Sequence, residues 1–466
     1  MSKTTVRRIR WFDPDPDDLQ SPENWRHASW ILATLFLNVF FWTAFETAFW
    51  VLYPLPIYAV VVVIAALIVA GLFFLGPALA AQRAEQTIFQ IVDRSVGTLP
   101  GFVLRCAGIG YLALWLAFLL DLPVLWWGAR FASRATANWE IGLAVGVILS
   151  FAFFTSAQSL PTRGQLAKFT CFVAIAILIA ALIRVRDGWP AALRVTFSSG
   201  DARYSLAAQG WHGLSTITFG VAPVAFLGAS YGRRVTTRQD VLRLTFTGIV
   251  LPLGGVLSIL GVISVVTSHS VIYQPSLFAG VNMALFGRAS RNAVLGRMVI
   301  LAFPVIGAVR FGMNLLRETV PGGSKVGRAS LLVISSWIVA LIPVYKGPVG
   351  GGDSARVFEI FASVFVVTAA VVSADYLVKS RTGLVKRIDW IGTGGALLGL
   401  VVPFGLNWWR IAQDESWWWP WLLPSYAISF TVCLLCRAVE DGIRRRRSTV
   451  PGRSENDGVQ AGLGQA

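Results

Sequence analysis

Residues 31–53, ILATLFLNVFFWTAFETAFWVLY, form an apolar run that is broken by one charged side chain, Glu46. A second apolar run, VILAFPVIGAVRFGMNLL at 299–316, contains Arg310. About 20 apolar residues suffice to cross a bilayer as a helix. Hydrocarbon penalises an ionised side chain by at least about 2.5–3.5 kcal/mol, so such residues usually face a cavity, a partner or a pathway. The two charges therefore indicate that something passes through the membrane.

The composition of the 466-residue chain is that of a membrane protein and not of a soluble enzyme. Hydrophobic residues make up 55% of the chain and charged residues 14%, whereas a soluble domain is about a quarter charged. The net charge of +16 then indicates positive cytoplasmic loops and not a nucleic-acid partner. The four cysteines all fall in apolar segments and give no disulfide framework.

Twelve apolar runs have the length of a membrane span, and the loops between them are short. We therefore expect an all-α integral membrane protein with about 12 transmembrane helices in one integral domain. The expected spans lie near 30–52, 57–80, 100–127, 140–158, 167–184, 209–230, 243–267, 295–316, 328–345, 357–378, 389–408 and 418–438.

The distribution of Lys and Arg predicts that both termini are cytoplasmic. In that orientation the cytoplasmic segments carry 27 of these residues and the external segments carry 12. Cytoplasmic loops of membrane proteins have such an excess. We expect a multi-pass protein of the plasma or bacterial inner membrane. Residues 1–27 form its cytoplasmic N-terminal segment and 441–466 its basic cytoplasmic tail, which we expect to be disordered.

The spans divide into two sets of five, which predicts an inverted repeat. The first five-helix repeat covers 28–185, the second covers 209–380, and two additional transmembrane helices follow at 388–440. An odd number of spans in each half reverses the orientation of the second half. In the sixth span, ITFGVAPVAFLG at 217–228, glycine and proline favour a broken helix whose freed backbone groups face a cavity or ligand. The alternative is a kinked helix whose small residues pack against a neighbour.

Four segments of the chain resemble one transporter family. APVAFLGASYGRRVTTRQDVLR at 222–243 is similar to an Ala-Pro segment that leads into an Asp-Tyr/Phe-x-Arg stretch. SADYLVKSR at 373–381 is similar to an Ala-Asp-Tyr element followed by basic residues. FQIVDRSVGTLPGFVLRCAGIGYLALW at 89–115 resembles an arginine-and-glycine loop, and RFGMNLLRETVPG at 310–322 an Asn-Leu segment before a proline. The family is that of the purine–cytosine permeases, or nucleobase–cation symporters. The resemblance implies the five-plus-five inverted-repeat fold.

The resemblance also implies a set of substrate-binding residues. On the third span Tyr111 and Trp115, one helical turn apart, would stack on a flat ring. On the sixth span Phe219 and Gly220 would meet the substrate, and on the eighth Asn314 would offer an amide donor and acceptor. The alternatives are an aromatic pair that packs within the bundle and an asparagine that bonds a neighbouring helix.

The chain departs from the family's sodium-dependent members on the eighth span. Those members have small hydroxyl residues just before the asparagine, whereas this chain has Ala308 and Val309, followed by Arg310. We hypothesise that the guanidinium replaces a cation and pairs with Glu46 or a carbonyl. The alternatives are that Glu46 binds a proton and that Arg310 extends to the cytoplasmic surface. We expect coupling to a proton and not to sodium, no metal site and no cofactor.

Two aspartates are candidate gate residues. Asp375, expected at the cytoplasmic end of the tenth span near Lys379 and Arg381, is interpreted as a gate or an anchoring ion pair. Asp121, near the outer end of the third span, is interpreted as a gate or as a hydrated residue at the interface.

The resemblance implies a permease that takes up a nucleobase or a related small heterocycle by alternating access. The alternative is an amino-acid or other polar-solute permease of the same architecture, which would present helix-end amides to a carboxylate. An enzyme is not expected, because the three histidines are not spaced with acidic residues as metal ligands and no catalytic motif occurs. The expected partners are a small heterocycle and the lipid bilayer; the sequence gives no indication of oligomeric state.

Overall fold

The structure is a computed structural model, and the part of the chain that it describes is helical. No strand occurs among these residues. Hydrocarbon contains no water for the backbone amides, and a helix satisfies them within its own segment. The described residues are 24–37, 42, 56–84, 88–104, 106–107, 160–188, 214, 221–270, 285, 352–378, 386–411 and 422–448.

Four helices in the described part are long and apolar enough to cross a bilayer. They are α3 (Pro56–Ala84), α7 (Leu160–Arg184), α18 (Leu422–Ser448) and the continuous run of α11 (Arg238–Thr245), η3 (Phe246–Val250) and α12 (Leu251–Ser270). The helices α16 (Gly352–Val378) and α17 (Trp390–Ile411) contain shorter apolar stretches. Each of these coincides with a predicted span, which confirms the expected helical membrane protein.

Two helices begin or end outside the bounds that the sequence suggested. The first helix, α1 (Asn24–Phe36), begins inside the segment expected to precede the membrane domain, and the Asn24 amide donates to the carbonyl of Arg234 at 3.2 Å. At the other end α18 continues to Ser448, inside the segment 441–466. Arginine is a good helix former, and positive charge near a helix C-terminus is favourable, so the basic run extends the helix instead of ending it.

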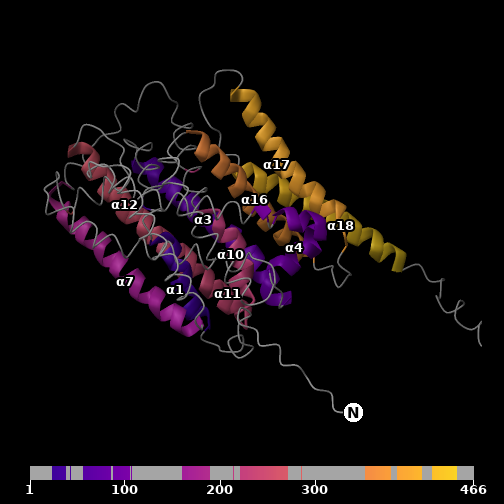
Figure 1. Ribbon diagram of the computed structural model, residues 1–466, viewed down its shortest axis with the longest axis horizontal. Coiled ribbons are helices and arrows are strands. Elements are labelled where there is room, and N and C mark those ends of the chain that lie inside the picture. Colours follow the sequence, from indigo (N-terminus) through magenta and orange to yellow (C-terminus); the bar gives the residue numbers. More distant parts are fainter. Residues whose placement is uncertain are drawn as a thin grey trace, which may run out of the picture.

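The packing of the helices has the exchange symmetry of an inverted repeat. The first span, α1, contacts the fifth, α7, and the seventh, which is the run α11–α12. The sixth span, α10 (Pro223–Gly232), contacts the tenth, α16, and the second, α3. The contact of α7 with α12 likewise has its counterpart in the contact of α16 with α3. Exchanging the first span with the sixth, the second with the seventh and the fifth with the tenth therefore reproduces the pattern. Figure 1 shows α3 and α10 between α7 and α1 on one side and α16–α18 on the other.

The sixth span contains both a helix start and a close helix contact. Pro223 is the first residue of α10, a position that suits proline because its missing N–H would have no partner there. A Cβ atom added to Gly228 would collide with the Phe74 carbonyl oxygen, and one added to Gly232 with the backbone of Ala78. Gly228 therefore packs against α3, as the alternative interpretation of this span expects. Gly220 lies outside the described residues, so the broken helix stays a prediction.

The contact between α10 and α3 predicts unequal effects of two glycine substitutions. Gly232→Ala forces two backbones apart, and overpacking of this kind costs about 1–3 kcal/mol. Gly255→Ala in α12, where nothing lies within 4 Å of the added carbon, is the control and is expected to gain about 0.5–1 kcal/mol from helix propensity. The midpoint of thermal unfolding in detergent measures both. Equal midpoints would contradict the close contact.

Candidate functional site

Asp375 is the one residue of the predicted site that the structure describes. It lies in the last turns of α16 and is mostly buried. The other predicted site residues fall outside the described residues, and their roles stay predictions. These are Glu46, Tyr111, Trp115, Asp121, Phe219, Gly220, Arg310 and Asn314.

The middle of the first predicted span contains a buried polar group that sequence reasoning did not single out. The side chain of Trp42 is fully buried. Within the described part of the chain no acceptor lies within hydrogen-bonding distance of its indole nitrogen, Nε1. A buried donor without a partner costs about 1–3 kcal/mol, and native proteins usually satisfy such groups. Trp42 is therefore a candidate to donate to a ligand.

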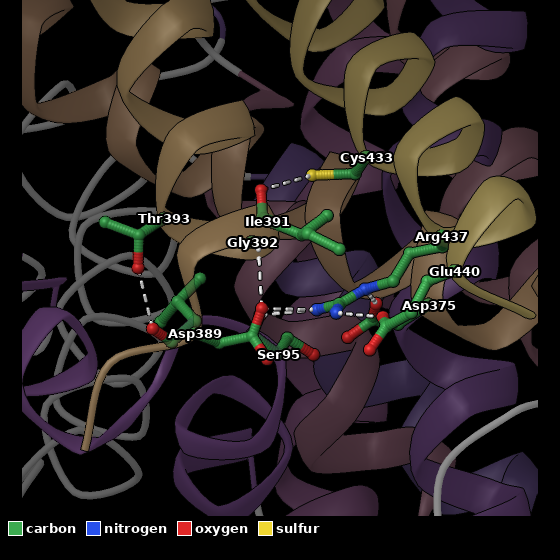
Figure 2. A network of polar contacts seen from close by, with 10 residues as sticks. Ser95, Asp375, Asp389, Ile391, Gly392, Thr393, Cys433, Arg437 and Glu440 are labelled. Carbon is green, nitrogen blue, oxygen red and sulfur yellow. Dashed lines mark hydrogen bonds and ion pairs between the residues drawn. The ribbon is translucent and has the colours of Figure 1, made fainter. Parts of the chain in front are cut away.

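Asp375 belongs to a cluster of charged groups around Arg437, a residue of α18. Figure 2 shows the guanidinium beside the carboxylates of Asp375 in α16, Asp389 just before α17, and Glu440 in α18 itself. Arg437 Nε donates to Asp375 Oδ1 at 2.6 Å, Nη2 donates to Asp389 Oδ1 at 2.8 Å, and Nη1 donates to Glu440 Oε2 at 3.3 Å. Nη2 also donates to the backbone carbonyl of Ser95 at 3.2 Å. We call these five residues the Arg437 cluster.

Asp389 holds the start of α17 in the cluster. Its carboxylate accepts from the backbone N–H of Gly392 at 3.1 Å, which is the bond of a helix N-cap. Its own backbone N–H donates to the backbone carbonyl of Val96, at the end of α4 (Ile88–Val96), at 2.9 Å. The Thr393 hydroxyl donates to the same carbonyl at 2.8 Å. One aspartate thus caps α17, pairs with Arg437 and connects to α4.

Gly97 permits this close approach between α4 and α17. Its φ of +98° lies in the left-handed region that favours glycine. A Cβ atom there would come within 2.8 Å of Arg387, Ile388 and Asp389. The following amides, those of Thr98 and Leu99, donate to the carbonyls of Lys386 and Arg387 at 3.1 Å each. The segment after α4 is therefore bonded along its backbone to the segment before α17.

Small residues bring α17 and α18 together beside the cluster. Gly395 and Gly399 of α17 face Cys433 and Ser429 of α18, and an added Cβ at either glycine would collide with the opposing side chain. Cys433 Sγ also donates to the Ile391 carbonyl at 3.6 Å. Close backbones at small residues are the usual means of helix association in membranes. These contacts fix the position of α18 along α17 and thereby the position of the Arg437 side chain.

The burial of the cluster determines what it can do. The side chains of Arg437 and Asp389 are 1% and 2% exposed, while those of Asp375 and Glu440 are 17% and 25% exposed. Removing one partner of a buried ion pair costs about 3–5 kcal/mol, because the other charge stays buried. The cluster is therefore a strong connection among four segments, and of the two roles suggested for Asp375 its geometry fits an anchoring ion pair.

The sequence contained a signal for Asp375 but not for its partners. Asp375 stands out as a charge next to a long apolar run. Arg437 counts among the basic residues at the expected cytoplasmic end, and Asp389 lies among loop charges. Arg437 is 48 residues from Asp389 and 62 from Asp375, so no local pattern pairs them. A single arginine inside LLCRAVED, at the end of an apolar run, was the one available hint.

Comparison with known proteins connects this fold to membrane transporters. Neither a protein-family model nor a curated protein sequence matches the chain. Among solved structures it is similar to Mhp1, a nucleobase-cation-symport-1 family transporter, in a closed conformation with bromovinylhydantoin bound. The TM-score is 0.63 and the identity 14%, over 95% of this chain and 97% of that chain.

Two further structures have the same fold. A Na⁺-coupled sialic acid symporter in a substrate-bound outward-open state matches with a TM-score of 0.58 and 11% identity, over 95% of this chain and 93% of that chain. A manganese transporter of Eremococcus coleocola matches with a TM-score of 0.52 and 13% identity, over 96% of this chain and 100% of that chain. These likenesses, at identities of 11–14%, confirm the predicted five-plus-five inverted-repeat fold.

The Arg437 cluster predicts strongly non-additive stability effects. Arg437→Gln is expected to cost about 3–5 kcal/mol by leaving buried carboxylates without the guanidinium. Asp389→Asn keeps the cap on α17 but removes the charge. The double variant should lose less than the sum of the single losses, by about 0.5–3 kcal/mol. Chemical denaturation in detergent micelles measures all three.

A surface ion pair is the control for this experiment. Arg186 Nε and Asp187 Oδ1 are 3.5 Å apart, and their side chains are 71% and 92% exposed. Arg186→Gln should therefore change the free energy of unfolding by no more than about 1 kcal/mol. If Arg437→Gln costs as little as Arg186→Gln, the buried connection is not what holds these helices together.

Proposed function

We propose that this protein is a secondary active transporter that takes up a nucleobase or a related small heterocycle by alternating access. The observation that carries the proposal is the fold shared with three solute transporters over at least 93% of each chain. One of them, Mhp1, binds a hydantoin derivative. The sequence resemblance to nucleobase–cation symporters was found independently, in segments of four different parts of the chain.

The buried indole of Trp42 supports a polar ligand at mid-membrane. Its N–H donor faces no acceptor among the described residues, and Trp42 lies near the centre of the predicted span 30–52. A heterocycle with ring carbonyls offers acceptors that such a donor would match. In a continuous helix Glu46, four residues later, would lie on the same face. We propose that Trp42 binds the solute and that Glu46 binds the coupling proton.

The second candidate is an amino-acid or other polar-solute permease, favoured by the sialic acid symporter among the structural neighbours. That substrate carries a carboxylate, which needs helix-end amides or a cation, whereas the predicted residues Tyr111, Trp115 and Asn314 suit a flat neutral ring. Manganese, the cargo of another neighbour, is a third solute to test.

The function is tested by ligand-induced thermal stabilisation of the purified protein, followed by uptake into proteoliposomes. Nucleobases, hydantoins and allantoin are expected to raise the unfolding midpoint in proportion to their affinity. Amino acids, sialic acid and Mn²⁺ are expected to leave it unchanged. Stabilisation by carboxylated solutes alone would establish the second candidate, and the best stabiliser should also be taken up.

Trp42→Phe tests the proposed donor. The substitution keeps an aromatic ring and removes the N–H, so binding of the heterocycle should weaken about tenfold, which corresponds to the loss of one buried hydrogen bond. Trp390→Phe is the matched control, because Trp390 is 78% exposed at the start of α17. The dissociation constants of the two variants are compared with that of the unchanged protein. Equal constants for all three would remove Trp42 from the site.

The coupling ion is tested in the same vesicles. Uptake should persist when choline replaces sodium, because Ala308 and Val309 stand where the family's sodium-dependent members have small hydroxyl residues, and the adjacent Arg310 would repel a cation. Uptake by the unchanged protein should increase with an inward proton gradient, and Glu46→Gln should remove that dependence while binding remains. Strong sodium dependence would contradict the proposal. We further propose that both termini are cytoplasmic, which protease accessibility from the two sides of the membrane would check.

A further inference from the structure

The Arg437 cluster connects both predicted repeats to the two added helices. Ser95 belongs to the first repeat, Asp375 to the second, and Asp389 and Arg437 to the added pair α17–α18. We propose that the cluster is a fixed joint, closed in every state of the transport cycle, and that Arg437 is a positioning residue. The inference rests on the proposed transport function and concerns residues other than the predicted substrate-binding ones.

Burial is the first reason why the cluster does not act as a gate. A gate opens once in each cycle, and opening this cluster would separate a 1% exposed arginine from a 2% exposed aspartate. Breaking a buried ion pair lowers the population of the open state by roughly 10²- to 10³-fold or more. By comparison, the side chains of Arg186 and Asp187 in their ion pair are 71% and 92% exposed, so water can replace either partner at little cost.

Backbone bonding is the second reason. The amides of Thr98, Leu99 and Asp389 donate to carbonyls across the joint at 3.1, 3.1 and 2.9 Å. These bonds contain no group whose charge an ion or a proton could change. Ligand binding can shift a conformational equilibrium only through a difference in affinity between its states. Neither the substrate nor the coupling ion is proposed to contact this segment, so neither has a means to open it.

The joint has a direct consequence for the predicted binding site. The helical residues 98–104 begin the third span, and in sequence Tyr111 and Trp115 follow on the same span. The joint holds the start of this span against the segment before α17, and Arg437 connects the preceding helix α4 to Asp375 of α16. Arg437 therefore acts on the substrate through the placement of the third span. Movement between inward- and outward-facing states must occur at other contacts.

A reversible cross-link across the joint tests the proposal. Thr98 and Arg387 are both exposed, and the Arg387 carbonyl accepts from the neighbouring Leu99 amide. Thr98→Cys and Arg387→Cys are combined in a protein whose exposed Cys106 and Cys436 are replaced by Ser. A short thiol-reactive linker joined by a disulfide connects the pair, and each single-cysteine variant is the control. Uptake of the heterocycle should stay within twofold of the unlinked protein. Loss of uptake that a reductant restores would show a gate and overturn the proposal.

A second measurement separates positioning from simple stabilisation. Arg437→Lys keeps the positive charge but loses the planar fork that reaches three carboxylates and a carbonyl. We expect the KM for uptake to rise several-fold at an unchanged maximal rate per folded molecule. Hydrogen exchange at Thr98 and Leu99 should accelerate as well. A residue that only stabilises the fold would lower the amount of folded protein at an unchanged KM.

The joint and the proposed function can fail separately. If the unlinked protein takes up no heterocycle, the proposed function is wrong, and the joint is then measured by hydrogen exchange alone. The amides of Thr98, Leu99 and Asp389 should stay equally protected with and without whichever solute stabilises the protein. Protection that changes more than tenfold on binding would refute a fixed joint.

Discussion

Hydrocarbon supplies neither water nor counter-ions, so every backbone amide and every charge inside the protein must find its partner there. Helices satisfy the amides within each segment. The Arg437 cluster satisfies charges at a place where one helix from each predicted repeat meets two added helices. Glycines meet the same constraint in another way, because Gly228, Gly232 and Gly395 let helices approach until their backbones or short side chains touch.

Equivalent helix contacts occur in the two halves of the fold. The contacts of α1 with α7 and α12 have counterparts in those of α10 with α16 and α3. Two similar sets of contacts with opposite orientation are suited to two states of similar energy, which alternating access requires. The added helices α17 and α18 have no counterpart in this exchange. They contact α16 and α4, and so make the protein asymmetric at one end (Figure 1).

Sequence reasoning located the helices because long apolar runs are a local signal. It also identified Asp375, because a charge next to such a run is conspicuous. It could not find Arg437 and Asp389 as partners, since their pairing depends on how distant helices are placed. It ended α18 too early, because a basic run resembles a soluble tail although arginine favours a helix. Trp42 was overlooked because tryptophan in an apolar run looks like packing, and its N–H becomes informative only when its neighbours are known.

The position of Arg437 in the sequence also determines when the cluster forms during synthesis. Ser95 and Arg437 are 342 residues apart, and ribosomes add about 5–20 residues per second, so roughly 20–70 s separate their synthesis. Until Arg437 is made, α4 and then also α16 and the start of α17 lack the guanidinium that connects them. The cluster is therefore completed only once α18 has been made, and a chain that ends before α18 would contain two aspartates, Asp375 and Asp389, without that cation.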